Sequence, residues 1–487
     1  MFLAKEGGLI LNTLKESKIY SLCLYISKLI NSWLANSYLI NLFLKEKDTT
    51  KKQEDFLITR ILYCFLNVFR KFFHKIHLDK IMKGSIFTKP EIWLTFVIAG
   101  TPFLPTMLVL AIEIFTAFTL FLKATLNEDF KIKFFNANPW IICFVIVVIV
   151  SAVTSFSTVE SYKIGLLITA FVLFYFIFIN TVDSKEQLLF YLGVFVLSGT
   201  LSALYGLYQY FFGDIYSQEW LDGEMFEEIK MRVYSTFSNP NVFGEYLLLV
   251  IPFSAVLCLN SKTWFGKLFW LGNCGVLMLA LVLTFSRGCW LGIIFSLFIL
   301  AILIDKRLIW LAVFALIISP FVLPTAIIER FLSIGNMADT STSYRVYIWL
   351  GTIAMLKDFF WCGIGLGTTS FNLVYPLYAY NEVVAPHSHS LYLQLFVEYG
   401  LIGFIVFACI MYNFYKEQFI SYVKTKNYIS IASIAAMSGF LLQSATDYTW
   451  YNYRVVLIFW MVIAIAHSSI HFDFANFNSK PKETVND

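Results

Sequence analysis

Three arginines and two histidines stand near the ends of long apolar segments, where charged and titratable side chains are uncommon. The arginines are Arg232 in RVYSTFSNPNVFGEYL, Arg287 in TFSRGCW and Arg345 in SYRVYIW; His387 and His389 both lie in PHSHSLYLQLFVEYGLIG. A guanidinium matches the oxygens of a phosphate bidentately, and a neutral imidazole can act as a general base near neutral pH. The combination indicates a site that holds a lipid-linked diphosphate beside a base for a sugar hydroxyl.

Each of these residues also has a plainer interpretation. A single arginine can extend its charge toward water or pair with an acid such as Glu224 or Glu398, although this explains three arginines on one face less well. A histidine can cap a helix or simply be hydrogen-bonded. The His-x-His spacing permits a metal site, but no third ligand lies at a convincing spacing, so we expect neither a metal nor a cofactor.

Two further polar motifs are open to more than one interpretation. Asn239-Pro240-Asn241 predicts a turn into a helix with an asparagine cap, and needs no functional role. Asp447 and Arg454 flank TDYTWYNYR and either pair structurally or line the path of an acceptor.

The composition defines the environment in which these residues act. Of 487 residues, 59% are hydrophobic and 14% charged, against roughly 25% charged in a soluble domain. Soluble, disordered and fibrous classes are excluded, and an integral membrane protein of many apolar helices is indicated. The eight cysteines show no CxxC spacing and are interpreted as small apolar residues, not as disulfides or metal ligands.

Apolar runs that can span a bilayer predict an all-α, polytopic fold with about twelve transmembrane helices. The first two runs are joined by a Pro-containing turn and form either two spans or one re-entrant unit. The predicted spans are 92–104, 105–122, 139–156, 164–181, 187–212, 242–260, 268–285, 288–304, 308–324, 390–414, 429–446 and 454–470.

Basic residues predict the orientation of these spans. Lysines and arginines concentrate in 123–138, 182–186, 261–267, 305–307 and 415–428, whereas 213–241 is acidic. Both termini are therefore expected in the cytoplasm and the long connector 325–389 outside. The connector contains an amphipathic stretch at 344–359 and a turn with Gly363, Gly365 and Gly367, so we expect it to be folded. The predicted organisation is an extension 1–91, spans within 92–324, the outer loop 325–389, spans within 390–470 and a tail 471–487.

The extension 1–91 holds 15 Lys and Arg against 8 Asp and Glu. It lacks the features of a cleavable signal peptide. Its stretches 17–44 and 56–82 mix apolar and basic residues at helical spacing, which indicates helices on an anionic, cytoplasmic membrane surface. A small helical extension that packs on itself is the alternative.

Residues from about 185 to 415 resemble the O-antigen ligase / polysaccharide polymerase superfamily of membrane glycosyltransferases. The resemblance rests on the order and spacing of four segments ahead of and after the long outer loop. These are TFSNPNVFGEYL, TFSRGCWLG, YRVYIWLGTIAMLKDFFWCGIGLGT and HSHSLYLQLFVEYGLIG.

This resemblance implies a GT-C-like enzyme at the outer face of a bacterial cytoplasmic membrane. Such enzymes pass a glycan from an undecaprenyl-diphosphate carrier to a hydroxyl of a glycan, lipid or protein acceptor, without a metal or a nucleotide sugar, and no nucleic-acid partner is expected. His389 matches the histidine that opens the family's H-N-x-Y-L-Q-like motif, with Ser390 in place of Asn, and His387 matches an upstream histidine. Arg287 and Arg232 match the arginines that hold the diphosphate, and Arg345 matches less closely.

Two other functions fit part of the sequence. A secondary transporter or a lipid-linked glycan flippase would also have many spans and buried charges, but transporters place those charges near the membrane midplane. A non-catalytic scaffold would use the extension for docking and leave the arginines and histidines unexplained. The sequence does not choose between ligase and polymerase.

Overall fold

The computed structural model describes residues 57–82, 84–133, 138–213, 231–322, 324–336 and 339–474. Within these residues every regular element is a helix. The predicted surface stretch 17–44, the acidic residues of 214–228, including Glu224, and the tail from 475 lie outside them.

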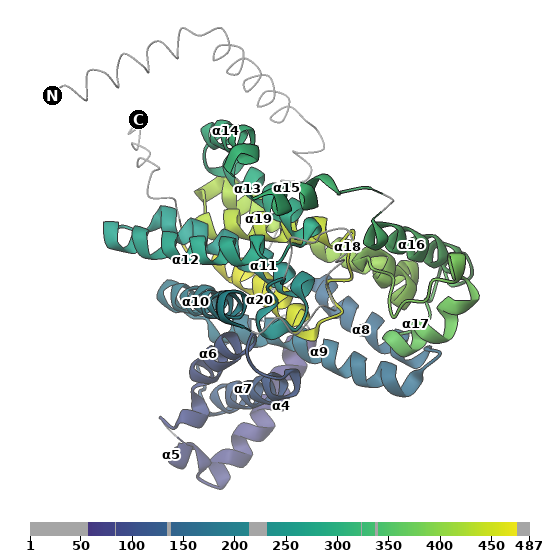
Figure 1. Cartoon of the computed structure of the whole chain (residues 1–487). Coiled ribbons are helices and arrows are strands. Elements are labelled where there is room, and N and C mark those ends of the chain that lie inside the picture. The colour runs from purple at the N-terminus through teal and green to yellow at the C-terminus, as the bar shows by residue number, and fades with distance from the viewer. Residues whose placement is uncertain are drawn as a thin grey trace, which may run out of the picture. The chain divides into compact units, whose positions relative to one another are not determined.

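Each of the twelve predicted spans overlaps an apolar helix, although the bounds differ at several of them (Figure 1). Seven helices in the described part are long and apolar enough to cross a membrane, so the protein is an all-α polytopic membrane protein. The helix α6 has only 11 residues and is about 16 Å long, about half of a hydrocarbon core, so it cannot cross alone. The twelve helices are α6 (Pro90–Gly100), α7 (Thr106–Leu126), α8 (Pro139–Val153), α9 (Thr158–Thr181), α10 (Lys185–Phe212), α11 (Pro240–Asn260), α12 (Trp264–Val282), α13 (Arg287–Ile304), α14 (Arg307–Val322), α18 (Leu391–Thr425), α19 (Tyr428–Gln443) and α20 (Tyr453–Ser469).

Polar caps set the start of several of these helices. The side chain of Asn239 accepts hydrogen bonds from the backbone N–H groups of Asn241 and Val242, as the sequence predicted, and Pro240 follows at the first helical position. Side chains of Asn138, Ser184, Thr263, Asn427 and Asn452 cap α8, α10, α12, α19 and α20 in the same way.

The helix α11 forms the centre of the core, and it packs against α10, α12, α13, α19 and α20. Its residues are almost entirely buried. The helices α13 and α19 approach closely because Gly292 and Gly439 face each other. A Cβ atom on Gly292 would lie 2.8 Å from the carbonyl oxygen of Gly439. Small residues allow such backbone contact between membrane helices.

The long connector is folded, as the sequence predicted. It contains α15 (Thr325–Leu332), α16 (Thr340–Asp358), α17 (Thr368–Val374) and the 3₁₀ turns η5 (Tyr375–Leu377) and η6 (Tyr380–Glu382). Gly363, Gly365 and Gly367 all have positive φ angles, between 67° and 93°, a region that glycine enters without strain.

The helix α18 differs from the predicted span 390–414 because it continues to Thr425 and takes in most of the predicted connector 415–428. Its first turns are separated from the rest by Gly400, whose φ is 69°. A Cβ atom there would lie 2.1 Å from the carbonyl oxygen of Trp361. The chain therefore bends at Gly400, where it passes the turn that follows α16.

The connectors meet at two separate ends of the helices. Connectors that the sequence predicts on the same side of the membrane hydrogen-bond one another. This is expected if successive helices cross the membrane in alternating directions. At one end Arg454 donates to the carbonyl oxygens of Pro102 and Thr236, and Val233 donates to Leu283; at the other, Lys133 pairs with Asp183 and Asn427 donates to Ser469.

Candidate functional site

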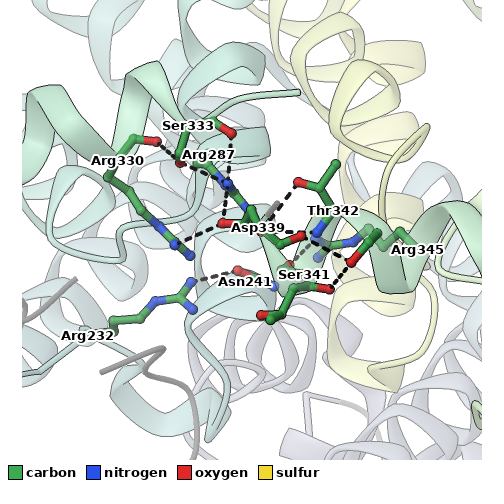
Figure 2. Close-up of polar contacts among 11 residues, drawn as sticks. Arg232, Asn241, Arg287, Arg330, Ser333, Asp339, Ser341, Thr342 and Arg345 are labelled. Carbon is green, nitrogen blue, oxygen red and sulfur yellow. Dashed lines mark hydrogen bonds and ion pairs between the residues drawn. The ribbon is translucent and has the colours of Figure 1, made fainter. Parts of the chain in front are cut away.

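Four arginines line a small cavity of about 50 Å³ at the first of these ends. They are Arg232, Arg287, Arg330 and Arg345, and they come from four separate segments of the chain. Figure 2 shows their side chains converging around Asp339, Asn241 and Ser341. Four positive charges so close together repel one another unless anions lie among them.

The carboxylate of Asp339 neutralises one side of the cavity. The Nη1 and Nη2 atoms of Arg287 donate to its two oxygens at 2.8 Å each, and Nη1 of Arg330 lies 3.8 Å away. Asp339 also accepts a hydrogen bond from the Thr342 N–H and so caps α16. Burial would raise the pKa of this carboxyl, but the hydrogen bond and charge of Arg287 outweigh burial and hold the pKa below its usual value. Asp339 is therefore a fixed anion that orients Arg287.

Arg232 lies on the opposite side of the cavity, in the segment before α11. Its Nε donates to the carbonyl oxygen of Thr284 and its Nη2 to Oδ1 of Asn241, both at 2.8 Å. Burial, with further repulsion from Arg330, Arg345 and Arg287, lowers the pKa of Arg232 to about 9. The guanidinium stays charged at neutral pH, and an entering anion would relieve this repulsion.

Asp447 connects the arginines to the histidines. Its Oδ2 lies 3.6 Å from Nη2 of Arg345 and accepts a hydrogen bond from Nδ2 of Asn241 at 3.3 Å, while its Oδ1 lies 3.4 Å from Nδ1 of His389. Burial would raise the pKa of this carboxyl, but the contact with His389 and the charge of Arg345 hold it well below its usual range. Asp447 is therefore ionised, and it faces one nitrogen of the His389 ring.

The backbone holds the His389 side chain in a defined position. Its φ of 49° is in the left-handed region, and its carbonyl oxygen accepts a hydrogen bond from Nε1 of Trp349. Its N–H donates to Nδ1 of His387 at 3.2 Å. Among the residues that the structure describes, none hydrogen-bonds Nε2 of His389. With Asp447 at Nδ1, this leaves Nε2 to accept a proton from another molecule.

His387 is buried and packs its ring against Tyr451, with the ring centroids 4.6 Å apart. Burial, together with the neighbouring His389, lowers the pKa of His387 to about 3. The ring is therefore neutral at physiological pH, and its Nδ1 accepts the hydrogen bond from His389. His387 therefore contacts His389 as a neutral hydrogen-bond acceptor.

On the side of α13, the cavity is lined by the start of a helix that no side chain caps. Ser286, Arg287 and Gly288 line it, and no side chain caps α13 at Ser286. The buried Nε of Arg345 has no hydrogen-bond partner within the described residues. A helix N-terminus and arginine N–H groups together favour a bound anion.

The structure thus brings all five predicted site residues into one connected cluster. Arg232, Arg287 and Arg345 line the same cavity, and His389, next to His387, reaches it through Asp447. The plainer interpretation holds in part, because two of the three arginines pair with acids: Arg345 with Asp447, and Arg287 with a second aspartate. That acid is Asp339; Glu398 instead accepts hydrogen bonds from Gln394 and Gly367. Asp447 and Arg454 have separate partners, so the proposed pair between them does not form.

Sequence reasoning missed Arg330 and Asp339. Both could have been noticed in the sequence: Arg330 lies in the last turn of the amphipathic helix TAIIERFL, and Asp339 stands in DTSTS as a helix cap. Their relation to Arg287 depends on the fold of the outer loop, which the spacing does not reveal. In the described part of the chain, no group of three or more His, Cys, Asp or Glu residues is arranged to hold a metal ion.

Fold and site together define a polytopic α-helical membrane protein with an arginine-lined anion site beside a His–Asp pair. A family model described as O-Antigen ligase matches residues 272–408. The match confirms the resemblance to the O-antigen ligase superfamily, and a function of the O-antigen ligase or polymerase type follows. The matched range contains six residues of the site: Arg287, Arg330, Asp339, Arg345, His387 and His389. Three others, Arg232, Asn241 and Asp447, lie outside the matched range. No curated protein matches the chain.

Proposed function

We propose that this protein is a glycosyltransferase that moves a glycan from an undecaprenyl-diphosphate carrier to an acceptor hydroxyl at the outer face of the bacterial cytoplasmic membrane. The observation that carries the proposal is the cavity with four arginines, joined to His389 through Asp447. The arginines supply bidentate donors for a diphosphate, and the His–Asp pair supplies a base. Both termini are cytoplasmic in this proposal.

His389 is the proposed base. Its Nε2 removes the proton of the acceptor hydroxyl while the hydroxyl oxygen attacks the anomeric carbon of the donor. Asp447 faces Nδ1 at 3.4 Å, and its negative charge stabilises the imidazolium that forms. The new C–O bond forms as the bond to the diphosphate breaks, and this single in-line displacement inverts the anomeric carbon.

The arginines are the proposed stabilisers of the leaving diphosphate. Arg232, Arg345 and Arg330 each approach the cavity from a different side, and Arg287 is held by Asp339. Guanidinium groups that are mostly buried and held in place stabilise developing negative charge without reorganising. Their number supports a reaction in which arginine charge takes the place of a divalent metal.

A transfer assay tests the proposal. The purified full chain in lipid nanodiscs would receive an undecaprenyl-diphosphate-linked glycan and a set of acceptors, and product would be followed by mass spectrometry with and without a chelator. We expect transfer that resists the chelator and falls by about 100-fold or more in His389→Ala.

The matched control is Arg307→Ala, because Arg307 is exposed and lies away from the cavity, at the start of α14. Arg232→Ala should raise the donor KM, whereas Arg307→Ala should leave it unchanged. Full activity in both His389→Ala and Arg232→Ala would refute the site assignment. Uptake of substrate into vesicles without glycan transfer would favour a transporter.

A further inference from the structure

Glu398, in the first turns of α18, is a buried acid to which the proposed transfer reaction gives no role; it is only 2% exposed. Its backbone is fixed just before the helix is interrupted at Gly400. The Glu398 carbonyl oxygen accepts a hydrogen bond from Oγ of Ser151 on α8 at 2.6 Å and another from the Gly365 N–H at 3.3 Å. The carboxylate is therefore carried by a backbone that two other segments hold in place.

Three hydrogen-bond donors converge on one oxygen of this carboxylate. Oε1 of Glu398 accepts from Nε2 of Gln394 at 3.0 Å, from the Gly367 N–H at 3.2 Å and from the Tyr448 hydroxyl at 3.4 Å. Because a buried donor that loses its partner is costly, each donor is held toward this oxygen. Two of the three donors lead to opposite halves of the His–Asp pair.

The first connection runs through Gln394 to the turn that carries His389. Oε1 of Gln394 accepts a hydrogen bond from the Ser388 N–H at 2.8 Å, while Nε2 of the same carboxamide donates to Glu398. A backbone N–H only donates and a carboxylate only accepts, so the two partners together fix the orientation of the amide. Ser388 directly precedes His389, whose φ of 49° is uncommon for a residue with a side chain. Gln394 therefore helps to hold the left-handed turn that directs the His389 ring.

The second connection runs through Tyr448 to Asp447. The Tyr448 hydroxyl donates to Glu398, and the backbone N–H of Tyr448 donates to Oδ1 of Asp447 at 2.9 Å. This is the same oxygen that lies 3.4 Å from Nδ1 of His389. The Tyr448 ring also packs near His387, with the ring centroids 5.5 Å apart. A restrained Tyr448 therefore restrains the orientation of the Asp447 carboxylate.

We propose that Glu398 is a positioning residue that sets the separation of His389 and Asp447. It restrains one of them through Gln394 and the other through Tyr448. The inference rests on the proposed role of His389 as the base, because a misplacement of about 1 Å at a reacting group can cost about 100-fold in rate. The three hydrogen-bond partners of the carboxylate lie outside the lining of the arginine cavity. Glu398 should therefore affect the transfer rate and not the affinity for the donor.

Transfer rates at varied donor concentration, normalised to folded protein, test the proposal. Glu398→Met keeps the length of the side chain but removes the accepting oxygen, and we expect kcat to fall by about 10-fold or more at a nearly unchanged donor KM. Glu398→Gln keeps an accepting oxygen and should restore kcat to within about threefold of the parent. Tyr448→Phe is the milder variant, because it removes one hydroxyl and keeps the ring. Since the two residues act through one contact, adding Tyr448→Phe to Glu398→Met should slow transfer no further.

The matched control is Tyr415→Phe, which also removes one tyrosine hydroxyl from a hydrogen bond on α18, here to Ser438. It should keep the parental kcat and donor KM. A Glu398→Gln variant as slow as Glu398→Met would overturn the proposal, and so would a rise in donor KM as large as the fall in kcat.

Nitrogen-15 NMR of the histidine rings gives a test that needs no glycan transfer. The chain has six histidines, and the His389 signals are identified by their absence in His389→Asn. The Asp447→Asn variant shows the ring signals of a His389 without the facing carboxylate. We expect Glu398→Met, and to a smaller extent Tyr448→Phe, to shift the His389 signals toward those of Asp447→Asn, and Tyr415→Phe to leave them unchanged.

Parental His389 signals in both Glu398→Met and Tyr448→Phe would overturn the proposal, whether or not the protein transfers glycan. Shifted signals in a protein that transfers no glycan would refute the proposed function and still support the positioning of His389 and Asp447 by Glu398. The two failures are therefore distinguishable.

Discussion

At the scale of single residues, Asp447 is the link between the two halves of the site. It contacts His389, Arg345 and Asn241, and so joins the base to the arginines. Asp447→Asn keeps the size of the side chain but removes the charge opposite Nδ1 of His389. We expect the transfer rate to fall by about 100-fold or more, with a smaller change in donor KM.

The control for this substitution is Asp358→Asn, at an acid that accepts a hydrogen bond from Tyr378 on the same outer segment. It should keep most of the activity. An Asp447→Asn variant that folds normally and transfers glycan at the parental rate would exclude Asp447 from the mechanism. Steady-state rates measured at varied donor concentration separate the effect on kcat from the effect on the donor KM.

His387 predicts how stability depends on pH. Burial lowers its pKa to about 3, so between about pH 6.5 and pH 3 the unfolded chain binds a proton that the folded chain rejects. Stability is therefore lost as the pH falls through this range, by about 2 kcal/mol between pH 6.5 and pH 5. His387→Gln removes this contribution. Melting temperatures in detergent at pH 7.5 and pH 5 should differ less for the variant than for the parent; an equal difference would contradict the prediction.

At the scale of elements, glycines determine where α18 passes the outer loop. Gly400 has a φ of 69°, and a Cβ there would lie 2.1 Å from the carbonyl oxygen of Trp361. Because backbone cannot move aside as a flexible side chain can, Gly400→Ala should lower the melting temperature by several degrees, with a loss of about 2 kcal/mol or more.

Gly272→Ala on α12 is the matched control. No atom lies within 4 Å of the position that its Cβ would take, and alanine favours a helix over glycine by about 1 kcal/mol. Its melting temperature should equal or exceed that of the parent. Equal melting temperatures for Gly400→Ala and the parent would contradict the bend described for α18.

The elements were predictable from sequence because each leaves a local pattern. Runs of apolar residues predicted the twelve helices, and Asn239 predicted the N-terminal cap of α11. The end of α18 was not predicted, because Lys416 and Glu417 suit a connector as well as an exposed helical turn. The neighbours of Arg287 were not predictable either: Asp339 is 52 residues away in the chain, and only the folded loop brings the two together.

At the scale of the whole molecule, the connectors gather at two ends of the helices. The arginine cavity and the His–Asp pair lie at one end, and the ion pair of Lys133 with Asp183 lies at the other. A long apolar core with α11 at its centre separates the connectors of the two ends. The proposed function requires the first end to face outward, where glycans are transferred, and the second to face the cytoplasm.

Two native cysteines allow this orientation to be measured. Cys362 is exposed in the turn between α16 and α17, within the connector predicted to lie outside, and Cys64 is exposed on α4 (Leu57–Lys75). In variants that keep only one of them, a membrane-impermeant maleimide added to intact spheroplasts should label Cys362 at once and Cys64 only after permeabilisation. Labelling of Cys64 alone in intact spheroplasts would place the arginine cavity in the cytoplasm. A carrier-linked glycan displayed outside could then not reach it, and the proposed reaction would fail whatever the activity of the purified protein.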